Sequence, residues 1–254
     1  MERLGRTAPT GINSNALKTW GMIFAMVGII GRSILQNRLL GVGTVSPLEL
    51  VELMQASESA MVISTVALIM QAIETCAIPI FAFALVEGFQ HTADWKQYFL
   101  RLAGIAVLSE IPYNLAIGMK VLDFGSRNPV FGLVLAFVML CLYRYFAGKK
   151  LICVVATIAA LAWAMMLKVE HGIPMLLIVC TLWVFRNKPM FRGFVGSAVA
   201  VACTVSSLFY LASPMGFLAI HLYNGEKGEN NRLVSYLFYP VAVLAIGLVA
   251  MFLF

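Results

Sequence analysis

Continuous apolar runs are the feature of this sequence that most restricts its fold. The runs "LICVVATIAALAWAMML" (151–167) and "PVAVLAIGLVAMFLF" (240–254) contain no charged residue. Segments of about 20 apolar residues cross the hydrocarbon core of a bilayer as helices. A transmembrane β-barrel would instead alternate apolar and polar residues. The runs therefore predict an all-α fold, a polytopic transmembrane helical bundle.

The overall composition agrees with a membrane protein and excludes two other classes. Of the 254 residues, 61% are hydrophobic and 12% are charged, whereas soluble domains have about 25% charged residues. The net charge of +6 does not indicate nucleic-acid binding, because the basic residues form short clusters between apolar runs, as membrane loops do. The five cysteines lie within apolar runs and form no CxxC motif, so we interpret them as small hydrophobic residues and expect no metal.

The apolar runs predict about eight spans in a single integral-membrane domain, residues 1–254. Pro79 and Pro214 lie inside the two longest spans and are expected to kink or break them. The segment 46–59 is amphipathic, and we expect it to lie on the membrane surface. The predicted spans are 17–36, 60–89, 97–118, 129–147, 150–167, 171–187, 193–222 and 232–254.

The distribution of lysine and arginine predicts the orientation. One side of the membrane, with the N-terminus and the loops after spans two, four and six, carries 11 of them: Arg3, Arg6, Lys18, Lys96, Arg101, Arg144, Lys149, Lys150, Arg186, Lys188 and Arg192. The other side carries 7: Arg32, Arg38, Lys120, Arg127, Lys168, Lys227 and Arg232. Because cytoplasmic loops are enriched in these residues, the counts predict that both termini are cytoplasmic.

Two acidic residues lie within the predicted spans. Glu74 is near the middle of the second span, and Glu110 is in the third, with Asn114 one turn further on the same face. A charge at the bilayer centre costs about 2.5–3.5 kcal/mol on insertion scales, so such residues face a bundle interior. Two interpretations remain: pairing with Arg32 or Arg127 that only holds helices together, or a functional cavity.

Polar residues from four spans converge on one membrane face in the predicted topology, which favours the cavity. They are Arg32, Arg127, Asn128, Glu170, His171, His221, Tyr223 and Asn224. We predict that Glu74 and Glu110 face one interior cavity beneath this face. Histidine and glutamate are common proton-transfer groups, although helix ends also collect them for solubility.

Another group of polar residues lies where span two ends and span three begins. Glu87 and His91 are one helical turn apart, and Lys96 and Arg101 follow. One interpretation is a solvated helix end. The other is a site for a cytoplasmic anionic ligand, in which Lys96 and Arg101 would meet phosphate.

Three motifs resemble a known family. The motifs "PIFAFALVEGFQHTADWKQYFLRLAGIAVLSEIPYNL", "RNPVFGLVLAF" and "LYNGEKG" followed by "YLFYP" are similar, in order and spacing, to the TraX family. That family is named for acetylation of conjugal-transfer pilin and is grouped with polytopic membrane acyltransferases that use cytoplasmic acetyl-CoA. The resemblance covers about residues 17–245 and places these residues on family motif positions: Glu87, His91, Arg101, Glu110, Pro112, Asn128, Tyr223, Asn224 and Gly225.

The first helix departs from the family pattern. Relatives usually end that helix with Asp-His-Ile-Gly, whereas this chain has "MVGIIGR" and neither an acid nor an imidazole there. If the Asp-His pair supplies the general base in relatives, this chain either uses another residue or has lost the chemistry. His171, in "EHG", is the best substitute candidate, at a position where the family more often has Asp-Tyr-Gly.

The resemblance implies a membrane acetyltransferase that transfers acetyl from cytoplasmic acetyl-CoA to an amine or hydroxyl acceptor on the extracytoplasmic side. The alternative is a non-enzymatic membrane protein, either an anionic-solute transporter or a degenerate family member. We expect a multi-pass protein of the bacterial inner membrane whose acceptor is a small molecule, glycan, lipid or peptide. The predicted catalytic residues are His171, Glu110 and Glu74. The predicted acetyl-CoA-binding residues are Glu87, His91, Lys96 and Arg101. The predicted acceptor-binding residues are Arg32, Asn114, Arg127, Asn128, His221, Tyr223 and Asn224.

Overall fold

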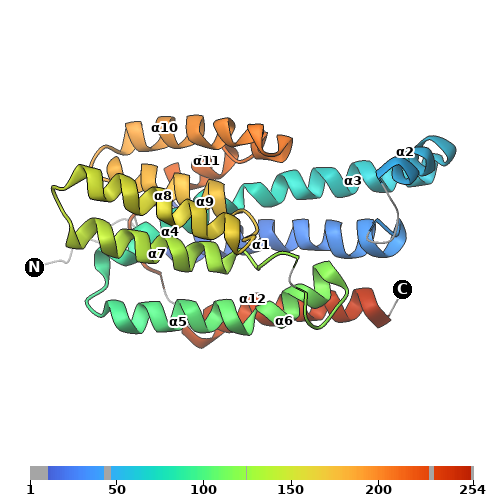
Figure 1. The fold of residues 1–254 in the computed structure, drawn as a ribbon, viewed down its shortest axis with the longest axis horizontal. Helices are drawn as coiled ribbons and strands as arrows, with labels where there is room; N and C mark the ends of the chain where they lie inside the picture. The colour runs from blue at the N-terminus through green and yellow to red at the C-terminus, as the bar shows by residue number, and fades with distance from the viewer. Residues whose placement is uncertain (1–10, 43–46, 124, 229–231, 253–254) are drawn as a thin grey trace, which may run out of the picture.

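Helices alone make up the regular structure of the part of the chain that the computed structural model describes, which comprises residues 11–42, 47–123, 125–228 and 232–252. They run roughly parallel or antiparallel to the long axis of the molecule (Figure 1). The all-α helical bundle predicted from the sequence is therefore confirmed. The elements are α1 (Ser14–Ile30), η1 (Gly31–Leu39), α2 (Pro47–Ala56), α3 (Glu58–Thr75), α4 (Ala77–His91), α5 (Trp95–Leu108), α6 (Glu110–Tyr113), η2 (Asn114–Gly118), α7 (Val130–Tyr145), α8 (Lys150–Met166), α9 (Gly172–Val184), α10 (Pro189–Ala202), η3 (Cys203–Val205), η4 (Leu208–Leu211), α11 (Met215–His221) and α12 (Arg232–Phe252).

Three stretches among the described residues are long and apolar enough to cross a membrane: Ser14–Leu39, Glu58–His91 and Trp95–Gly118. Shorter apolar helices pack beside them: Val130–Tyr145, Lys150–Met166, Gly172–Val184, Pro189–Val205, Leu208–His221 and Leu237–Phe252. Large apolar side chains also cover much of the outer surface, for example Leu151, Ile158 and Phe194. A hydrocarbon environment accepts such a surface, so these features identify a membrane protein.

The two prolines expected in the second and seventh spans mark breaks there. The helical stretch Glu58–His91 is interrupted at Cys76, three residues before Pro79, because proline has no N–H with which to continue the hydrogen-bond ladder. Pro112 follows a similar break at Ser109 in the third stretch. Two π-helices, η1 and η2, end the first and third stretches.

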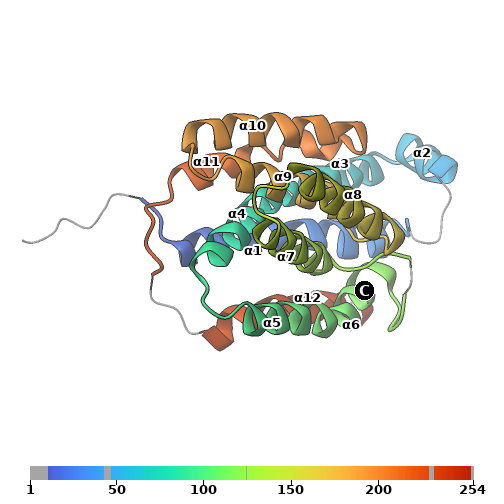
Figure 2. The ribbon, with the colours of Figure 1, turned by 60° about the vertical axis from the view of Figure 1, so that its left-hand side comes forward.

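Helix α4 lies at the centre of the short-helix half of the bundle. It contacts α1, α7, α9 and α11, and its side chains Ile80 and Phe89 are fully buried. Figures 1 and 2 show α10 on one side of this core and α5 with α12 on the opposite side. Helix α4 is therefore the central packing element of this half of the bundle.

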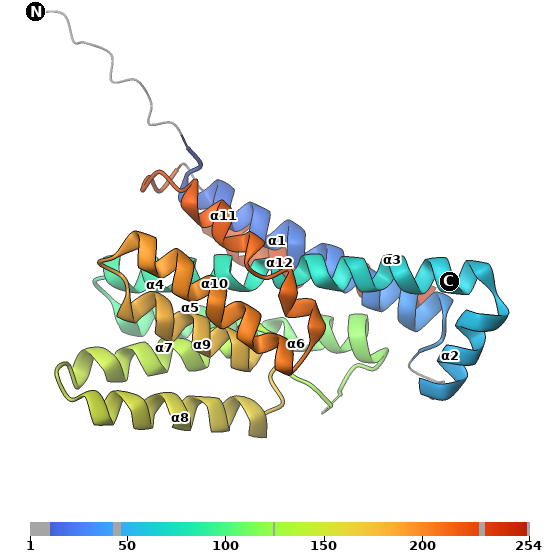
Figure 3. The same cartoon turned by 90° about the horizontal axis from the view of Figure 1, so that it is seen from above.

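The predicted seventh span, 193–222, is wrong as a single crossing. Helix α10 runs away from the end where α9 stops, and after η3 and η4 the chain returns as α11, so residues 189–221 form a helical hairpin (Figure 3). Its far end, residues 203–214, is called the hairpin tip below. Ser206, Ser207 and Pro214 lie in this tip, where polar groups and a missing N–H interrupt the helix.

The hairpin reverses the predicted position of everything that follows it. The loop after α11 pairs with the start of the described chain: Ile12 N donates to Leu222 O at 2.9 Å, and Asn224 N donates to Ile12 O at 3.0 Å. Near its other end, α12 packs Gly247 against Ala116 of η2. The two ends of the described chain therefore lie at opposite ends of the bundle, whereas the topology predicted from the sequence brings both ends of the chain to one side.

We call the end that holds Ile12 the N-terminal face, and the end that holds the 125–129 loop, the α8–α9 turn and the hairpin tip the opposite face. Among residues whose side chains are described, ten basic residues lie at or near the N-terminal face: Lys18, Lys96, Arg101, Arg144, Lys149, Lys150, Arg186, Lys188, Arg192 and Lys227. Five lie toward the other end: Arg32, Arg38, Lys120, Arg127 and Lys168. Over these same residues the predicted topology gave nine and six, and the difference is the move of Lys227 to the N-terminal face.

Candidate functional site

Arg32 joins two carboxylates inside the bundle. Its Nη2 lies 2.7 Å from Glu74 Oε1, and its Nη1 lies 2.8 Å from Glu170 Oε1. The Glu74 side chain is 5% exposed and that of Arg32 13%, so water screens these charges little. Three segments meet here: η1, the end of α3 and the turn before α9.

The turn between α8 and α9 supplies Glu170 and His171. Burial opposes ionisation of Glu170, but the charge of Arg32 and its hydrogen bond to this carboxylate hold the pKa of the carboxyl below its ordinary value. His171 has φ 54°, a left-handed conformation uncommon for a residue with a side chain. This backbone strain is a feature often found at functional sites.

The His171 ring lies between a hydroxyl and the two carboxylates. Its Nδ1 is 2.8 Å from the Tyr210 hydroxyl. Its Nε2 is 3.6 Å from Glu74 Oε1 and 3.8 Å from Glu170 Oε1. We call Arg32, Glu74, Glu170, His171 and Tyr210 the interior cluster.

Some buried polar atoms at this cluster have no hydrogen-bond partner among the described residues. They include Arg32 Nε, His171 Nε2 and the Tyr239 hydroxyl. Tyr239 interacts electrostatically with Arg32, Glu74, Glu170 and Glu110. Buried polar groups in native proteins are normally satisfied by protein, water or a ligand, so the cluster has the capacity to bind a further polar group.

A second ion pair lies beside the interior cluster. Arg127 Nη1 is 2.8 Å from Glu110 Oε1, and Asn128 Nδ2 donates to Glu110 Oε2 at 2.7 Å and to Ala106 O at 2.8 Å. The backbone links the two sites, since Arg127 N donates to Lys168 O at 3.0 Å and Glu170 N donates to Arg127 O at 2.9 Å. Glu74 and Glu110 thus each have an arginine partner of their own.

Asn114, a predicted acceptor-binding residue, begins η2 next to the segment that carries Glu110. It is 2% exposed, and its Nδ2 has no hydrogen-bond partner among the described residues. Asn37 of η1 donates to Ile117 O at 2.7 Å, so the two π-helices lie against each other. π-helical turns occur frequently at functional sites.

The predicted acetyl-CoA-binding residues lie at the N-terminal face and make contacts within their own helices. His91 Nδ1 is 2.9 Å from Glu87 O and 3.8 Å from Glu87 Oε1. Arg101 donates to Gln97 Oε1 at 2.9 Å. Lys96 is exposed. The described contacts do not join Lys96 and Arg101 to His91.

His221, Tyr223 and Asn224 are not part of the face that carries Arg32 and Arg127, contrary to the prediction. The hairpin returns them to the N-terminal face, where the Tyr223 ring lies edge-on to Phe83 at 5.3 Å. Burial raises the pKa of the Tyr223 hydroxyl, and the nearby Glu87 carboxylate adds to the shift. The residues at the end of the predicted seventh span therefore do not join those of the other three spans on one face.

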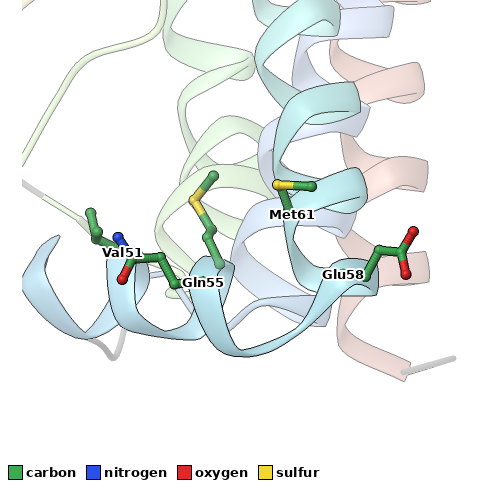
Figure 4. Close-up of a pocket in the computed structure, with 5 residues that line it drawn as sticks. Val51, Gln55, Glu58 and Met61 are labelled. Atoms are coloured by element: carbon green, nitrogen blue, oxygen red, sulfur yellow. The ribbon is translucent and has the colours of Figure 1, made fainter.

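A surface hollow lies at the far end of the long helices. It is lined by Val51, Met54, Gln55, Glu58 and Met61 (Figure 4). Glu58 is 16 residues before Glu74 on α3, about 24 Å away along a helix. None of the predicted site residues lines this hollow, so it does not extend the interior cluster.

Sequence reasoning missed Tyr210 as a site residue and did not assign Glu170 a role. Tyr210 lies in the apolar run 193–222, which the sequence predicts as one span. The signal that could have found it is the polar sequence around it, "SSLFYLASP", which is a poor fit to a lipid-facing helix centre. A break there would have predicted the hairpin and placed Tyr210 at its tip.

The fold and site define a polytopic helical membrane protein with a buried network of ionisable side chains. The model of the TraX family, described as TraX protein, matches residues 53–250, and the chain belongs to this family. The match begins after the first helix, so it covers Glu74, Glu110, His171 and Tyr210 but not Arg32. No curated protein and no solved structure matches the chain.

Proposed function

We propose that this protein is an integral-membrane acetyltransferase that uses acetyl-CoA and acts on an amine or hydroxyl acceptor. The observation that carries the proposal is the position of His171, between the Tyr210 hydroxyl and the Glu74 and Glu170 carboxylates. A hydroxyl, an imidazole and a carboxylate in this order form an arrangement that many acyl-transfer enzymes use. Family membership adds support, because the TraX resemblance implies acetyl transfer.

His171 is the group best placed to hold the acceptor's proton. A general base must take that proton as the acceptor attacks the thioester carbonyl. The imidazolium that forms would lie beside two carboxylates, which stabilise its charge. Glu110 has a different environment, since Arg127 and Asn128 occupy both of its oxygens. We therefore favour His171 over Glu110 as the base.

The acetyl donor would enter from the N-terminal face, which carries the excess of basic side chains and is therefore expected to be cytoplasmic. Lys96 and Arg101 would meet its phosphates, with Glu87 and His91 nearby. Glu87 and Glu74 are 13 residues apart on one helical stretch, about 20 Å. The thioester must reach that far along α4 to meet the cluster. The acceptor would approach the opposite face, near Arg127 and Asn128.

The cellular setting follows from the same proposal. A positively charged N-terminal face predicts that this end is in the cytoplasm of a bacterial inner membrane. The family name connects the chain to conjugal transfer. An acceptor presented on the extracytoplasmic side would suit an enzyme that modifies an exported or membrane-embedded molecule.

The experiment is acetyl transfer from labelled acetyl-CoA in membranes that carry equal amounts of each variant. We expect His171→Ala to lower the rate about 10²- to 10⁴-fold, and His91→Ala to act mainly on the apparent affinity for acetyl-CoA. Glu110→Gln tests the rival base. Full activity of both His171→Ala and Glu110→Gln would refute the mechanism.

A non-enzymatic role is the second candidate, and one observation favours it. Glu74 and Glu110 are each paired with an arginine, as expected if they only hold helices together. The first helix also lacks the acid and imidazole that the TraX resemblance implies there. Absence of acetyl-CoA binding by the unmutated protein, measured with labelled acetyl-CoA, would favour this candidate.

A further inference from the structure

The hairpin tip is attached to the chain segment that carries Glu74. Thr75 Oγ1 donates to Phe209 O at 3.0 Å, and Cys76 Sγ donates to Ala212 O at 3.2 Å. A Cβ on Gly216, just beyond the tip, would overlap the Cys76 carbonyl. The residues directly after Glu74 therefore hold the backbone on both sides of Tyr210. This attachment fixes the position of the Tyr210 side chain relative to that of Glu74.

Tyr210 is buried at the inner side of this tip, while its neighbours face outward. Tyr210 is 7% exposed, whereas Leu208 is 81% and Leu211 is 67% exposed. The Tyr210 and His171 rings meet edge to face at 5.8 Å. The contact between the hydroxyl and Nδ1, at 2.8 Å, has the length of a strong hydrogen bond.

The neighbours of His171 decide which way this hydrogen bond runs. Carboxylates only accept hydrogen bonds, and two of them lie nearest to Nε2. In the neutral form of the ring, the field of these carboxylates favours the hydrogen on Nε2, which leaves Nδ1 as the acceptor. The Tyr210 hydroxyl must then be the donor to Nδ1.

From this geometry we infer that Tyr210 is a catalytic residue, through which the acceptor's proton reaches His171. The inference rests on the proposed acetyltransferase function and deepens it. The nitrogen of His171 that can take a proton meets the Tyr210 oxygen, so a substrate proton passes by way of the phenol. Tyr210 then contacts the acceptor, and His171 acts behind it.

The transfer balances without a further reactant. As the acceptor atom bonds to the acetyl carbon, its proton moves to the phenolic oxygen while the phenolic proton moves to Nδ1. The bond between the acetyl carbon and the CoA sulfur breaks and leaves a thiolate. The proton on His171 returns through Tyr210 to that thiolate, so the products are acetylated acceptor and CoA thiol.

The test uses Tyr210→Phe, which removes the hydroxyl and keeps the ring. We expect the rate of acetyl transfer to fall about 10²-fold or more, with acetyl-CoA binding unchanged. The control is Tyr143→Phe, which removes another partly buried hydroxyl that hydrogen-bonds Thr157 and Cys180 away from the cluster. Full activity of Tyr210→Phe, alongside an active unmutated protein, would overturn the inference and leave the proposed function standing.

A second measurement does not depend on activity. The chain has three histidines, so ¹⁵N spectra of the detergent-solubilised protein can resolve each ring, with His171→Gln assigning the signal. We expect a neutral Nε2–H ring for His171, and a shift of its Nδ1 resonance in Tyr210→Phe but not in Tyr143→Phe. A hydrogen on Nδ1 in the unmutated protein would make Tyr210 the acceptor and exclude the relay. If the unmutated protein itself showed no acetyl transfer, that result would instead refute the proposed function.

Discussion

The carboxylate of Glu74 fills the space that a side chain on Gly28 would need. A Cβ placed on Gly28 would overlap Glu74, which is how α3 brings this acid against α1. Gly28 lies in "MVGIIGR", the stretch for which the TraX resemblance implies an acid and an imidazole. In this chain the carboxylate of Glu74, from the neighbouring helix α3, occupies that place. The next residue, Ile29, belongs to a buried apolar cluster with Tyr113 and Val243.

Gly28→Ala should therefore displace Glu74 and weaken its contact with Arg32. Overpacking of this kind typically costs about 1–3 kcal/mol. Thermal unfolding in detergent measures it. The matched control is Gly104→Ala in α5, where no atom lies near the added methyl group, so that the higher helix propensity of alanine should leave stability equal or improved. Equal melting temperatures for the two variants would contradict the observed packing.

Removal of Arg32 should destabilise the protein more than removal of Arg127. Arg32→Gln leaves the buried Glu74 carboxylate and the partly exposed Glu170 carboxylate without this cation, and breaking a buried ion pair costs about 3–5 kcal/mol. The Arg127 side chain is 28% exposed where it pairs with Glu110, so water can replace part of the interaction. The unfolding temperature should fall most for Arg32→Gln, less for Arg127→Gln and least for the exposed Arg101→Gln. A larger loss for Arg127→Gln would show that Arg32 is not the central charge.

The hairpin predicts that the loop after α11 is on the same side of the membrane as the loop before α5. Lys227→Cys and Ala93→Cys should show the same accessibility to an impermeant thiol reagent in intact cells, and Lys120→Cys the reverse. With the N-terminal face in the cytoplasm, only Lys120→Cys is labelled. Labelling at position 227 without labelling at 93 would restore the single crossing that the structure excludes.

Thr75→Val should loosen the hairpin tip. The change keeps the shape but removes the side-chain donor to Phe209 O, which retains its bond from Ala212 N. The net loss of one such hydrogen bond costs about 0.5–1.5 kcal/mol. Thr65→Val is the control on the same helix, because its hydroxyl bonds only the preceding turn, at Met61 O. Limited proteolysis near residues 206–208, together with unfolding temperature, should separate the two variants. Identical profiles would mean that this bond does not hold the tip.

Several features could be predicted from the sequence because they depend on local composition. Six of the helical stretches begin and end within a few residues of the predicted spans, since apolar runs of membrane length leave few alternatives to a helix. The break before Pro79 follows from a missing N–H. The motifs that resemble the TraX family identified the family that the comparison confirmed.

The sequence by itself determined that this protein is an all-α membrane bundle with acidic groups in its interior. Only the tertiary structure decided which groups meet. Hydropathy reports how apolar a run is but not where it turns, so the run 193–222 concealed a hairpin, and the loop at 222–228 was assigned to the wrong end. The same turn brings Tyr210 to His171, which lies 39 residues earlier. The Glu74 contact likewise depends on the closeness of two helices that Gly28 permits, and such contacts are set by packing in three dimensions.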